Sequence, residues 1–279
     1  TARVAREAGA DHVLRLPIHR GLAVAWRAGL DRALALGADV VVSTDADRQY
    51  AAADVVTLVG PILRGEAEIV VGDRGVATKE DVSPGKRLVQ RLGSWVVRRA
   101  SGTDVPDATS GFRALTREAA LRLNVHSRMT YTTETLIQAG HKNMAVRSVR
   151  VGTNPPVRPS RLFRRTSRYV LVQAANILRI TALYKPLPVF LGLSAVAFLL
   201  GAGLFARYAW ILLTDPTPGA HVQSLLVAAV LLVVSFLALA AGLLADLISI
   251  NRALLEETLY RLRRQEAARG TEDGDDARG

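Results

Sequence analysis

The chain has 279 residues, no cysteine and a formal net charge of +11 at pH 7. Without cysteine it can form no disulfide, use no thiol nucleophile and hold no cysteine-ligated zinc. Arginine carries almost all of the positive charge, which is typical of proteins that bind nucleic acid, anionic lipid or phosphorylated substrates. Nucleic acid is the least favoured of these partners, because no basic helix interleaved with aromatic residues is present and the arginines concentrate beside apolar segments.

Residues 1–157 alternate between helix-forming and strand-forming segments. The chain begins inside a predicted helix, without a methionine, and we expect further sequence upstream of residue 1. The order of elements predicts an α/β fold, with a mixed sheet covered by helices on both faces. The predicted elements are a helix over 21–37 with Leu22, Trp26, Leu30, Ala33 and Leu34 inward, a strand over 38–45, a helix over 52–65, a strand over 67–74, and a helix over 86–102 with Leu88, Leu92, Trp95 and Val96 inward.

Two acidic residues follow the first predicted strand, one residue apart. Ligands of such sheets bind beyond the carboxyl ends of the strands, where Asp45, Asp47 and Arg74 are all predicted to lie. Two carboxylates in one small space repel each other unless a cation is present, and their oxygens suit Mg²⁺ or Mn²⁺, which would in turn bridge a diphosphate. Taken alone, an Asp-x-Asp pair also occurs in surface turns and at helix N-caps.

Two uncharged stretches lie in the C-terminal half, over residues 187–206 and 222–245. Each is long enough to cross a hydrocarbon core of about 30 Å as a helix, and they predict a two-helix transmembrane hairpin over 187–248. The alternative is a pair of buried core helices. Basic residues flank both outer ends, whereas the connecting loop offers only Arg207, so we predict a multi-pass protein of the cell membrane whose catalytic domain and both termini are cytoplasmic.

A basic loop and an amphipathic segment connect the two halves. Over residues 158–186, apolar residues at helical spacing with basic flanks predict a helix lying in the headgroup region. An ordinary helix on the core of the first domain would show the same pattern. Residues 249–279 are predicted to be a cytoplasmic tail, partly disordered, because the end of the chain is polar.

Four segments of the chain resemble, in order, the motifs of family 2 glycosyltransferases of the GT-A fold. The resemblance is to the branch of dolichyl-phosphate mannose synthases and bacterial polyprenyl-phosphate glycosyltransferases, and it extends to about Pro188. It implies that the family's first strand and its acidic nucleotide-binding segment precede residue 1. The segments are HRGLAVAWRAGL, DADRQY, VGDRG and DATSGFRAL, similar to Asn-x-Gly-Lys-Gly-x-Ala, Asp-Ala-Asp-Gly-Gln-His, the Gly-Ser-Arg turn and Asp-x-x-Ser-Gly-Phe-Arg.

The resemblance implies a role for each matching residue. Asp45, Asp47 and Gln49 would hold the metal, and Asp45 would also contact the donor. Other matching residues also have structural explanations. Arg74 could be a surface arginine, Asp107 a turn residue and Gly111 a residue with positive φ. Glu134 could simply place a favourable negative charge at the start of a helix. The residues implied to bind the donor are Asp45, Arg74, Gly21, Ser110 and Gly111, and those implied to be catalytic are Asp47, Asp107, Arg113 and Glu134. The residues implied to bind the acceptor phosphate are Arg158, Ser160 and Arg161. This last group could equally be a basic patch that is attracted to anionic lipid.

The chain departs from the family pattern at several positions. His19 stands for asparagine, Leu22 and Ala23 for lysine and glycine, and Arg48 for the glycine after the acidic pair. Loss of the lysine removes a phosphate contact, and Arg48 is a candidate replacement for its charge.

The implied function is that of a membrane-anchored, inverting, metal-dependent glycosyltransferase, which moves a hexose from a nucleotide diphosphate sugar to polyprenyl phosphate. A phosphate monoester is already anionic at neutral pH, so it needs no strong general base. Two alternatives stay open: transfer to a lipid or protein hydroxyl, which would need a base such as Glu134, and a catalytically inactive, membrane-tethered scaffold. The oligomeric state, including a homo-oligomer, also stays open.

Overall fold

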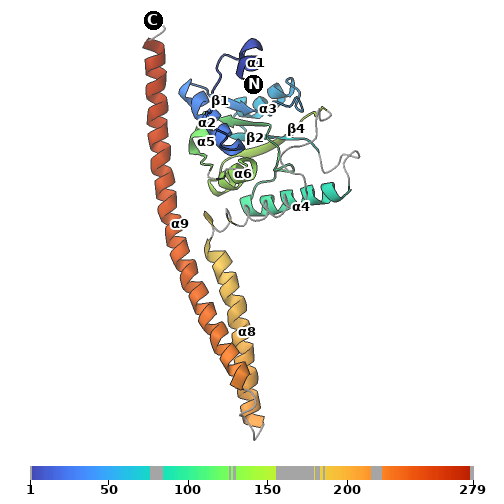
Figure 1. The fold of residues 1–279 in the computed structure, drawn as a ribbon, viewed down its shortest axis with the longest axis vertical. Coiled ribbons are helices and arrows are strands. Elements are labelled where there is room, and N and C mark those ends of the chain that lie inside the picture. The colour runs from blue at the N-terminus through green and yellow to red at the C-terminus, as the bar shows by residue number, and fades with distance from the viewer. Residues whose placement is uncertain are drawn as a thin grey trace. The chain divides into compact units, whose positions relative to one another are not determined.

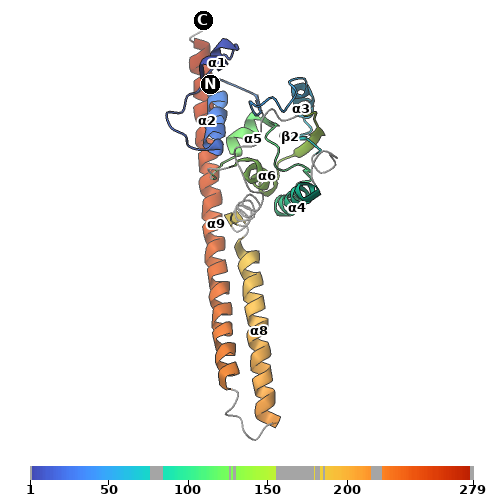
Figure 2. The same cartoon turned by 45° about the vertical axis from the view of Figure 1, so that its right-hand side comes forward.

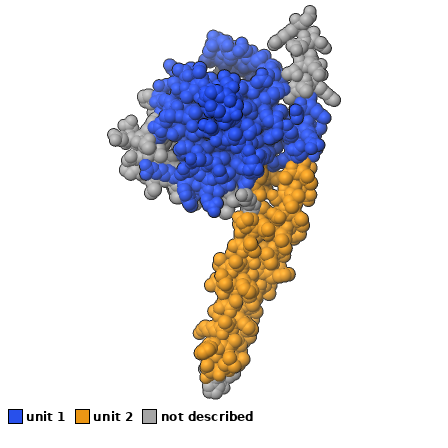
Figure 3. All heavy atoms as spheres, turned by 180° about the vertical axis from the view of Figure 1, so that it is seen from behind, with its two compact units in different colours: residues 1–178, 256–279 blue, residues 179–255 orange. Residues whose placement is uncertain are grey.

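The computed structural model describes residues 2–75, 84–125, 127, 130–154, 179, 183–184, 186–214 and 222–276. It divides into two compact units, one of residues 1–178 with 256–279 and one of residues 179–255 (Figure 3). In chain order the elements are α1 (Ala2–Glu7), α2 (Leu22–Ala35), β1 (Val40–Ser43), α3 (Asp54–Leu63), β2 (Ile69–Asp73), α4 (Pro84–Ser101), β3 (Arg113–Thr116), α5 (Arg117–Arg122), α6 (Thr132–His141), β4 (Val146–Arg150), α8 (Pro186–Thr214) and α9 (Val222–Asp276) (Figure 1).

The described strands form a four-stranded mixed sheet in the order β1-β3-β2-β4. β3 is antiparallel to both of its neighbours, whereas β2 and β4 are parallel. Central β2 is almost fully buried, and β1, at one edge, is half-buried along its whole length. The predicted mixed sheet is confirmed.

Helices pack on both faces of this sheet, as predicted (Figure 1). Side chains alternate between the two faces of a strand. Accordingly, Val40 and Val42 of β1 pack with the cluster around α3, whereas Val41 packs with Leu30 and Leu34 of α2 on the opposite side. The inner face predicted for α2 is correct at Leu30 and Leu34 but wrong at its first turn, where Leu22 is 42% exposed.

The inward face of α4 differs from the prediction at Trp95, whereas the side chains of Leu88 and Leu92 lie outside the described ones. Trp95 is 56% exposed, and the buried stripe runs instead through Ser94, Val97 and Ser101. α4 packs against α6 so closely that a Cβ on Gly140 would lie 1.6 Å from the carbonyl oxygen of Ser101. Such an approach requires small residues at the contact. A prediction from hydrophobic spacing alone puts the large side chain of Trp95 at this contact instead.

Helix α8 and the part of α9 up to Leu255 form most of the second unit, and Figure 2 shows both helices in a second orientation. Both are long and apolar enough to cross a membrane. They pack through small residues: the hydroxyls of Ser194 and Ser235 each donate to the other's carbonyl oxygen at 2.9 Å, and a Cβ on Gly201 would lie 3.2 Å from the carbonyl oxygen of Ala228. Close approach through small residues is typical of helices that associate in membranes.

The predicted tail over residues 249–279 is helical along most of its length, because α9 continues as one helix to Asp276. The physical reason is composition, because the sequence after the apolar stretch is rich in Ala, Leu, Glu and Arg, which are strong helix formers. The predicted interfacial helix over 158–186 lies almost entirely outside the described residues.

Candidate active site

The candidate site lies where three segments converge at one edge of the sheet. Because β1 and β2 are both antiparallel to β3, they run in the same direction. Their carboxyl ends and the amino end of β3 therefore share an edge. Arg113, the first residue of β3, pairs with Ser43 on one side and Val71 on the other. The acidic motif, the turn after β2 and the loop before β3 are thereby brought together, as the sequence predicted.

Asp45, just beyond β1, lies against Gly111. A Cβ on Gly111 would lie 3.1 Å from Asp45 Oδ2 and 3.1 Å from the hydroxyl of Tyr131. The φ angle of Gly111 is outside the left-handed region, so the positive-φ interpretation of this residue is wrong. Glycine is favoured here because a larger residue would push on the Asp45 carboxylate and the Tyr131 hydroxyl.

The Asp45 carboxylate is electrostatically destabilised in the folded chain. Although part of the side chain is open to solvent, burial by the surrounding protein raises its pKa, and the negative charge of Asp47 raises it further. The positive charge of Arg74 opposes these effects only in part. A carboxylate in such surroundings is stabilised by a bound cation.

A tight turn follows Asp45. Asp47 Oδ1 accepts a hydrogen bond from the backbone N–H of Gln49 at 3.1 Å, and Arg48 between them has a φ of 62°. This left-handed conformation is easiest for glycine, the residue that the family pattern has at this position. Asn154 holds the turn from outside, since its side chain donates to the Arg48 carbonyl at 3.0 Å and its backbone N–H donates to the Gln49 carbonyl at 2.8 Å.

The donor atoms of this turn fit a hard divalent cation. Asp45, Asp47 and Gln49 offer carboxylate and amide oxygens, which suit Mg²⁺ or Mn²⁺. Among the described residues, however, no three His, Asp or Glu side chains are grouped closely enough to hold a metal. The protein would thus supply a few ligands and leave the rest to water and substrate phosphates, the usual arrangement for Mg²⁺.

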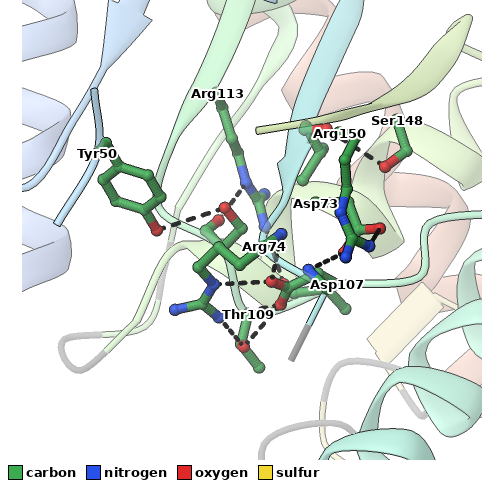
Figure 4. Close-up of polar contacts among 12 residues, drawn as sticks. Tyr50, Asp73, Arg74, Asp107, Thr109, Arg113, Ser148 and Arg150 are labelled. Carbon is green, nitrogen blue, oxygen red and sulfur yellow. Dashed lines mark hydrogen bonds and ion pairs between the residues drawn. The ribbon is translucent and has the colours of Figure 1, made fainter. Parts of the chain in front are cut away.

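Arg74 and Asp107 form a bidentate ion pair beside the acidic turn (Figure 4). Arg74 Nε donates to Asp107 Oδ2 at 2.7 Å and Nη2 donates to Oδ1 at 3.0 Å, while Thr109 donates to the same Oδ1 at 3.1 Å. Burial alone would raise the pKa of Asp107, but the hydrogen bonds and charge of Arg74 outweigh it, and the pKa is lowered. Asp107 is therefore a weak base whose contacts anchor the loop before β3.

Arg113 is fully buried and is bonded to its surroundings on all sides. Its guanidinium donates to the carbonyls of Ala108, Ser110 and Thr132 at 2.7–2.9 Å and to the hydroxyl of Thr135 at 2.7 Å. Burial lowers its pKa to about 10, so the group stays charged at neutral pH. These contacts join the Ala108–Ser110 loop to the first turn of α6. Arg113 therefore has a structural role, in which it fixes the position of the loop at the site.

Glu134 lies in the first turn of α6 and is 2% exposed. Its Oε2 accepts from the backbone N–H of Ser127 at 3.0 Å, and its Oε1 accepts from the side chain of Gln138 at 3.4 Å. Ser110 is also buried, with its hydroxyl 3.5 Å from that of Tyr50. Gly21, with a φ of 93°, is the residue before α2, so glycine is favoured there by backbone conformation.

The predicted acceptor residues and Tyr131 differ from the other site residues in how the sequence and the structure describe them. Arg158, Ser160 and Arg161 of the predicted acceptor set lie outside the described residues. Tyr131 was not predicted: it stacks on Trp26 with ring centroids 4.4 Å apart, and its hydroxyl donates to the Gly111 carbonyl at 3.2 Å. Its only signal in the sequence is its position just before the TTETL helix, three residues ahead of Glu134.

Replacing Asp45 with asparagine is expected to raise the Tm of the metal-free protein at pH 7. Because the pKa of Asp45 is raised by folding, the ionised side chain costs stability above its folded pKa, and this cost is absent below the unfolded value of about 3.9. The gain should therefore disappear near pH 3.5. Thermal unfolding with a chelator tests this, with Asp31→Asn on the exposed face of α2 as the control; a lower Tm for D45N at pH 7 would contradict the electrostatic account.

Comparison with known proteins finds similarity to one family in this part of the chain. Residues 2–123 match the model of "Glycosyl transferase family 2". The chain is 37% identical over 103 residues to UDP-N-acetylglucosamine–dolichyl-phosphate N-acetylglucosaminyltransferase of Methanococcus voltae, covering 36% of this chain, and 32% identical over 132 residues to the glycosyltransferase AglJ of Haloferax volcanii, covering 46% of this chain. It spans 41% of the length of each of these relatives.

A solved structure is also similar, that of glucosyl-3-phosphoglycerate synthase from Mycobacterium tuberculosis in complex with phosphoglyceric acid. The identity is 23%, the TM-score is 0.45, and the match covers 64% of this chain and 62% of that one. The match to the family model covers the residues that build the sheet edge described above. Residues 2–123 are therefore similar to the domain of glycosyl transferase family 2.

Proposed function

We propose that the protein is a membrane-bound glycosyltransferase that moves a sugar from a nucleotide diphosphate to a polyprenyl phosphate at the cytoplasmic face of the membrane. The family 2 domain supports the transferase activity and a nucleotide sugar donor. The name of the Methanococcus voltae relative supports a dolichyl-type lipid phosphate as acceptor and adds N-acetylglucosamine to the hexoses as a candidate sugar. The two apolar helices support the membrane location.

The donor would be bound at the acidic turn and the ion pair beside it. Asp45, Asp47 and Gln49 would hold Mg²⁺ or Mn²⁺, which, when bound, offsets the negative charge of the departing nucleoside diphosphate. Arg74 keeps a positive charge within electrostatic reach of Asp45. Gly111 leaves room for the Asp45 carboxylate, so these residues together fix the position of the donor pocket.

The observation that supports a phosphate acceptor is that both candidate bases, Asp107 and Glu134, already accept hydrogen bonds from other residues. Asp107 is paired with Arg74 and Thr109, and Glu134 is buried and accepts hydrogen bonds from Ser127 and Gln138. A hydroxyl acceptor would need a carboxylate that is available to take its proton. A phosphate monoester, whose second pKa is about 6, attacks as an anion without one. The arrangement therefore favours a phosphorylated lipid.

A choice among acceptors tests this proposal. The membrane-reconstituted protein would be given radiolabelled UDP-N-acetylglucosamine, UDP-glucose or GDP-mannose, each with polyprenyl phosphate, polyprenol or diacylglycerol. We expect label in the organic phase with polyprenyl phosphate alone, in a product that mild acid hydrolyses at the sugar phosphate. Label on polyprenol or diacylglycerol would overturn the acceptor, and failure to bind any nucleotide sugar would favour the scaffold alternative.

A further inference from the structure

The C-terminal part of α9 packs on the catalytic domain as an additional element of its fold. Residues 256–279 belong to the same compact unit as residues 1–178. Tyr260 is 9% exposed and packs with Leu30 and Leu34 of α2 and with Leu121 of α5. Its hydroxyl donates to Glu118 at 2.5 Å, and Arg122 lies over its ring with its guanidinium carbon 5.2 Å from the ring centroid. The Tyr260 side chain therefore joins α9 to both α2 and α5.

Two charged residues of α9 add polar contacts on either side of Tyr260. Glu256 forms an ion pair with Lys142 at 2.9 Å, in which the two side chains are 11% and 22% exposed. Arg263 Nη1 donates to the carbonyl of Leu123 at 3.1 Å and to Asn124 Oδ1 at 2.9 Å. Leu123 is the C-cap of α5, where a positive charge interacts favourably with the helix dipole.

Asn124 connects Arg263 to a buried polar chain that leads into α6. The Asn124 N–H donates to Gln138 Oε1 at 2.9 Å, and Gln138 donates in return to the Asn124 carbonyl. Gln138 donates also to Glu134, which accepts the N–H of Ser127. Asn124, Gln138 and Glu134 are all at most 4% exposed, and a buried network of this kind is rigid only while each member is paired.

The start of α6, in turn, supports the candidate site. The carbonyl of Thr132 accepts from Arg113, and Tyr131, the residue before the helix, donates to the Gly111 carbonyl beside Asp45. A shift at the start of α6 would thus move the wall on which the Asp45 carboxylate rests. The contacts form a continuous path from Arg263 on α9 to Gly111.

We propose that Arg263 is a positioning residue for transfer, which fixes Glu134 and the start of α6 through Asn124 and Gln138. Its effect on activity rests on the proposed function, whereas its effect on the order of α6 does not. Loss of Arg263 leaves the Leu123 carbonyl and the Asn124 side chain without this charged donor and frees the chain that leads to Ser127.

The test compares Arg263→Ala with Arg261→Ala in membrane-reconstituted protein. Arg261 is two residues away on the same helix and forms an exposed ion pair with Glu257 of that helix. Hydrogen–deuterium exchange over residues 124–138 is expected to rise roughly tenfold in R263A, as for the loss of a hydrogen bond to a charged group. R261A should match the wild type, and Arg263→Lys should restore part of the protection.

Two further measurements separate positioning from general loss of structure. In a double-mutant cycle with Asn124→Ala, the effects on exchange should be non-additive, because both residues act through one contact. In the transfer assay, R263A should raise the KM for the nucleotide sugar donor, because the path ends beside Asp45, and leave the KM for polyprenyl phosphate unchanged. Equal exchange in R263A and R261A would overturn the inference, and so would additive effects. An absence of sugar transfer by the wild-type protein would overturn the proposed function and not the inference. The hydrogen–deuterium exchange measurement would then still test the role of Arg263.

Discussion

Replacing Arg113 with alanine is expected to destabilise the unit of residues 1–178 and 256–279 by at least about 3 kcal/mol. The substitution leaves a cavity in the place of a fully buried side chain and removes the donor from three carbonyls and the Thr135 hydroxyl. Relief of the buried charge offsets only part of this loss. In a domain of this size the Tm should fall by roughly 6–12 °C, as measured by calorimetry.

Two controls locate the origin of this effect. Arg113→Met fills most of the volume but donates no hydrogen bond, so it should recover only the part of the loss that is due to the cavity. Arg32→Met, on the exposed side of the last turn of α2, should leave the Tm close to that of the wild type. A Tm for R113A within 2 °C of the wild type would show that the guanidinium does not hold the Ala108–Ser110 loop to α6.

Replacing Asp47 with asparagine is expected to lower sugar transfer at least about 100-fold and to leave the fold intact. The asparagine oxygen can still accept from the Gln49 N–H, so the turn that holds Arg48 is kept. What is lost is one of the two charges that would bind the cation. Initial rates of transfer and thermal unfolding, measured on the same preparation, separate these effects.

The control for Asp47 is an aspartate outside the candidate site. Asp104→Asn removes a carboxylate that is 94% exposed and forms a surface ion pair with Arg98, so its transfer rate should equal that of the wild type. If D47N transferred sugar at the wild-type rate across a range of Mg²⁺ and Mn²⁺ concentrations, the metal role of Asp47 would be wrong.

The convergence of the motifs was predictable because it depends on strand direction and chain order alone. Two strands of the same direction carry Asp45 and Arg74 to one edge, whatever the details of packing, and the Ser-Gly-Phe-Arg segment enters β3 from that same edge. The need for glycine at residue 111 was predictable, but its reason was not. It depends on the side chains of Asp45 and Tyr131, which come from segments 66 and 20 residues away.

The faces of the helices were harder to predict, because they depend on which partner each helix meets. Trp95 is exposed since α4 and α6 approach through Ser101 and Gly140, a contact that favours small residues over apolar ones. The packing of Tyr260 and Arg263 on the domain was missed for a related reason. A polar, arginine-rich segment after an apolar span resembles a solvated tail unless its partners, here Glu118 and Asn124, are known.

The cation role of Asp45 and Asp47 is tested most directly by the binding of Mn²⁺ to the acidic turn, followed by electron paramagnetic resonance in the presence of a nucleoside diphosphate. We expect the wild-type protein to remove free Mn²⁺ from solution when the diphosphate is present, and D45N and D47N each to bind it far more weakly. Binding by both variants at the wild-type affinity would contradict the claim that these two carboxylates hold a cation for the sugar donor.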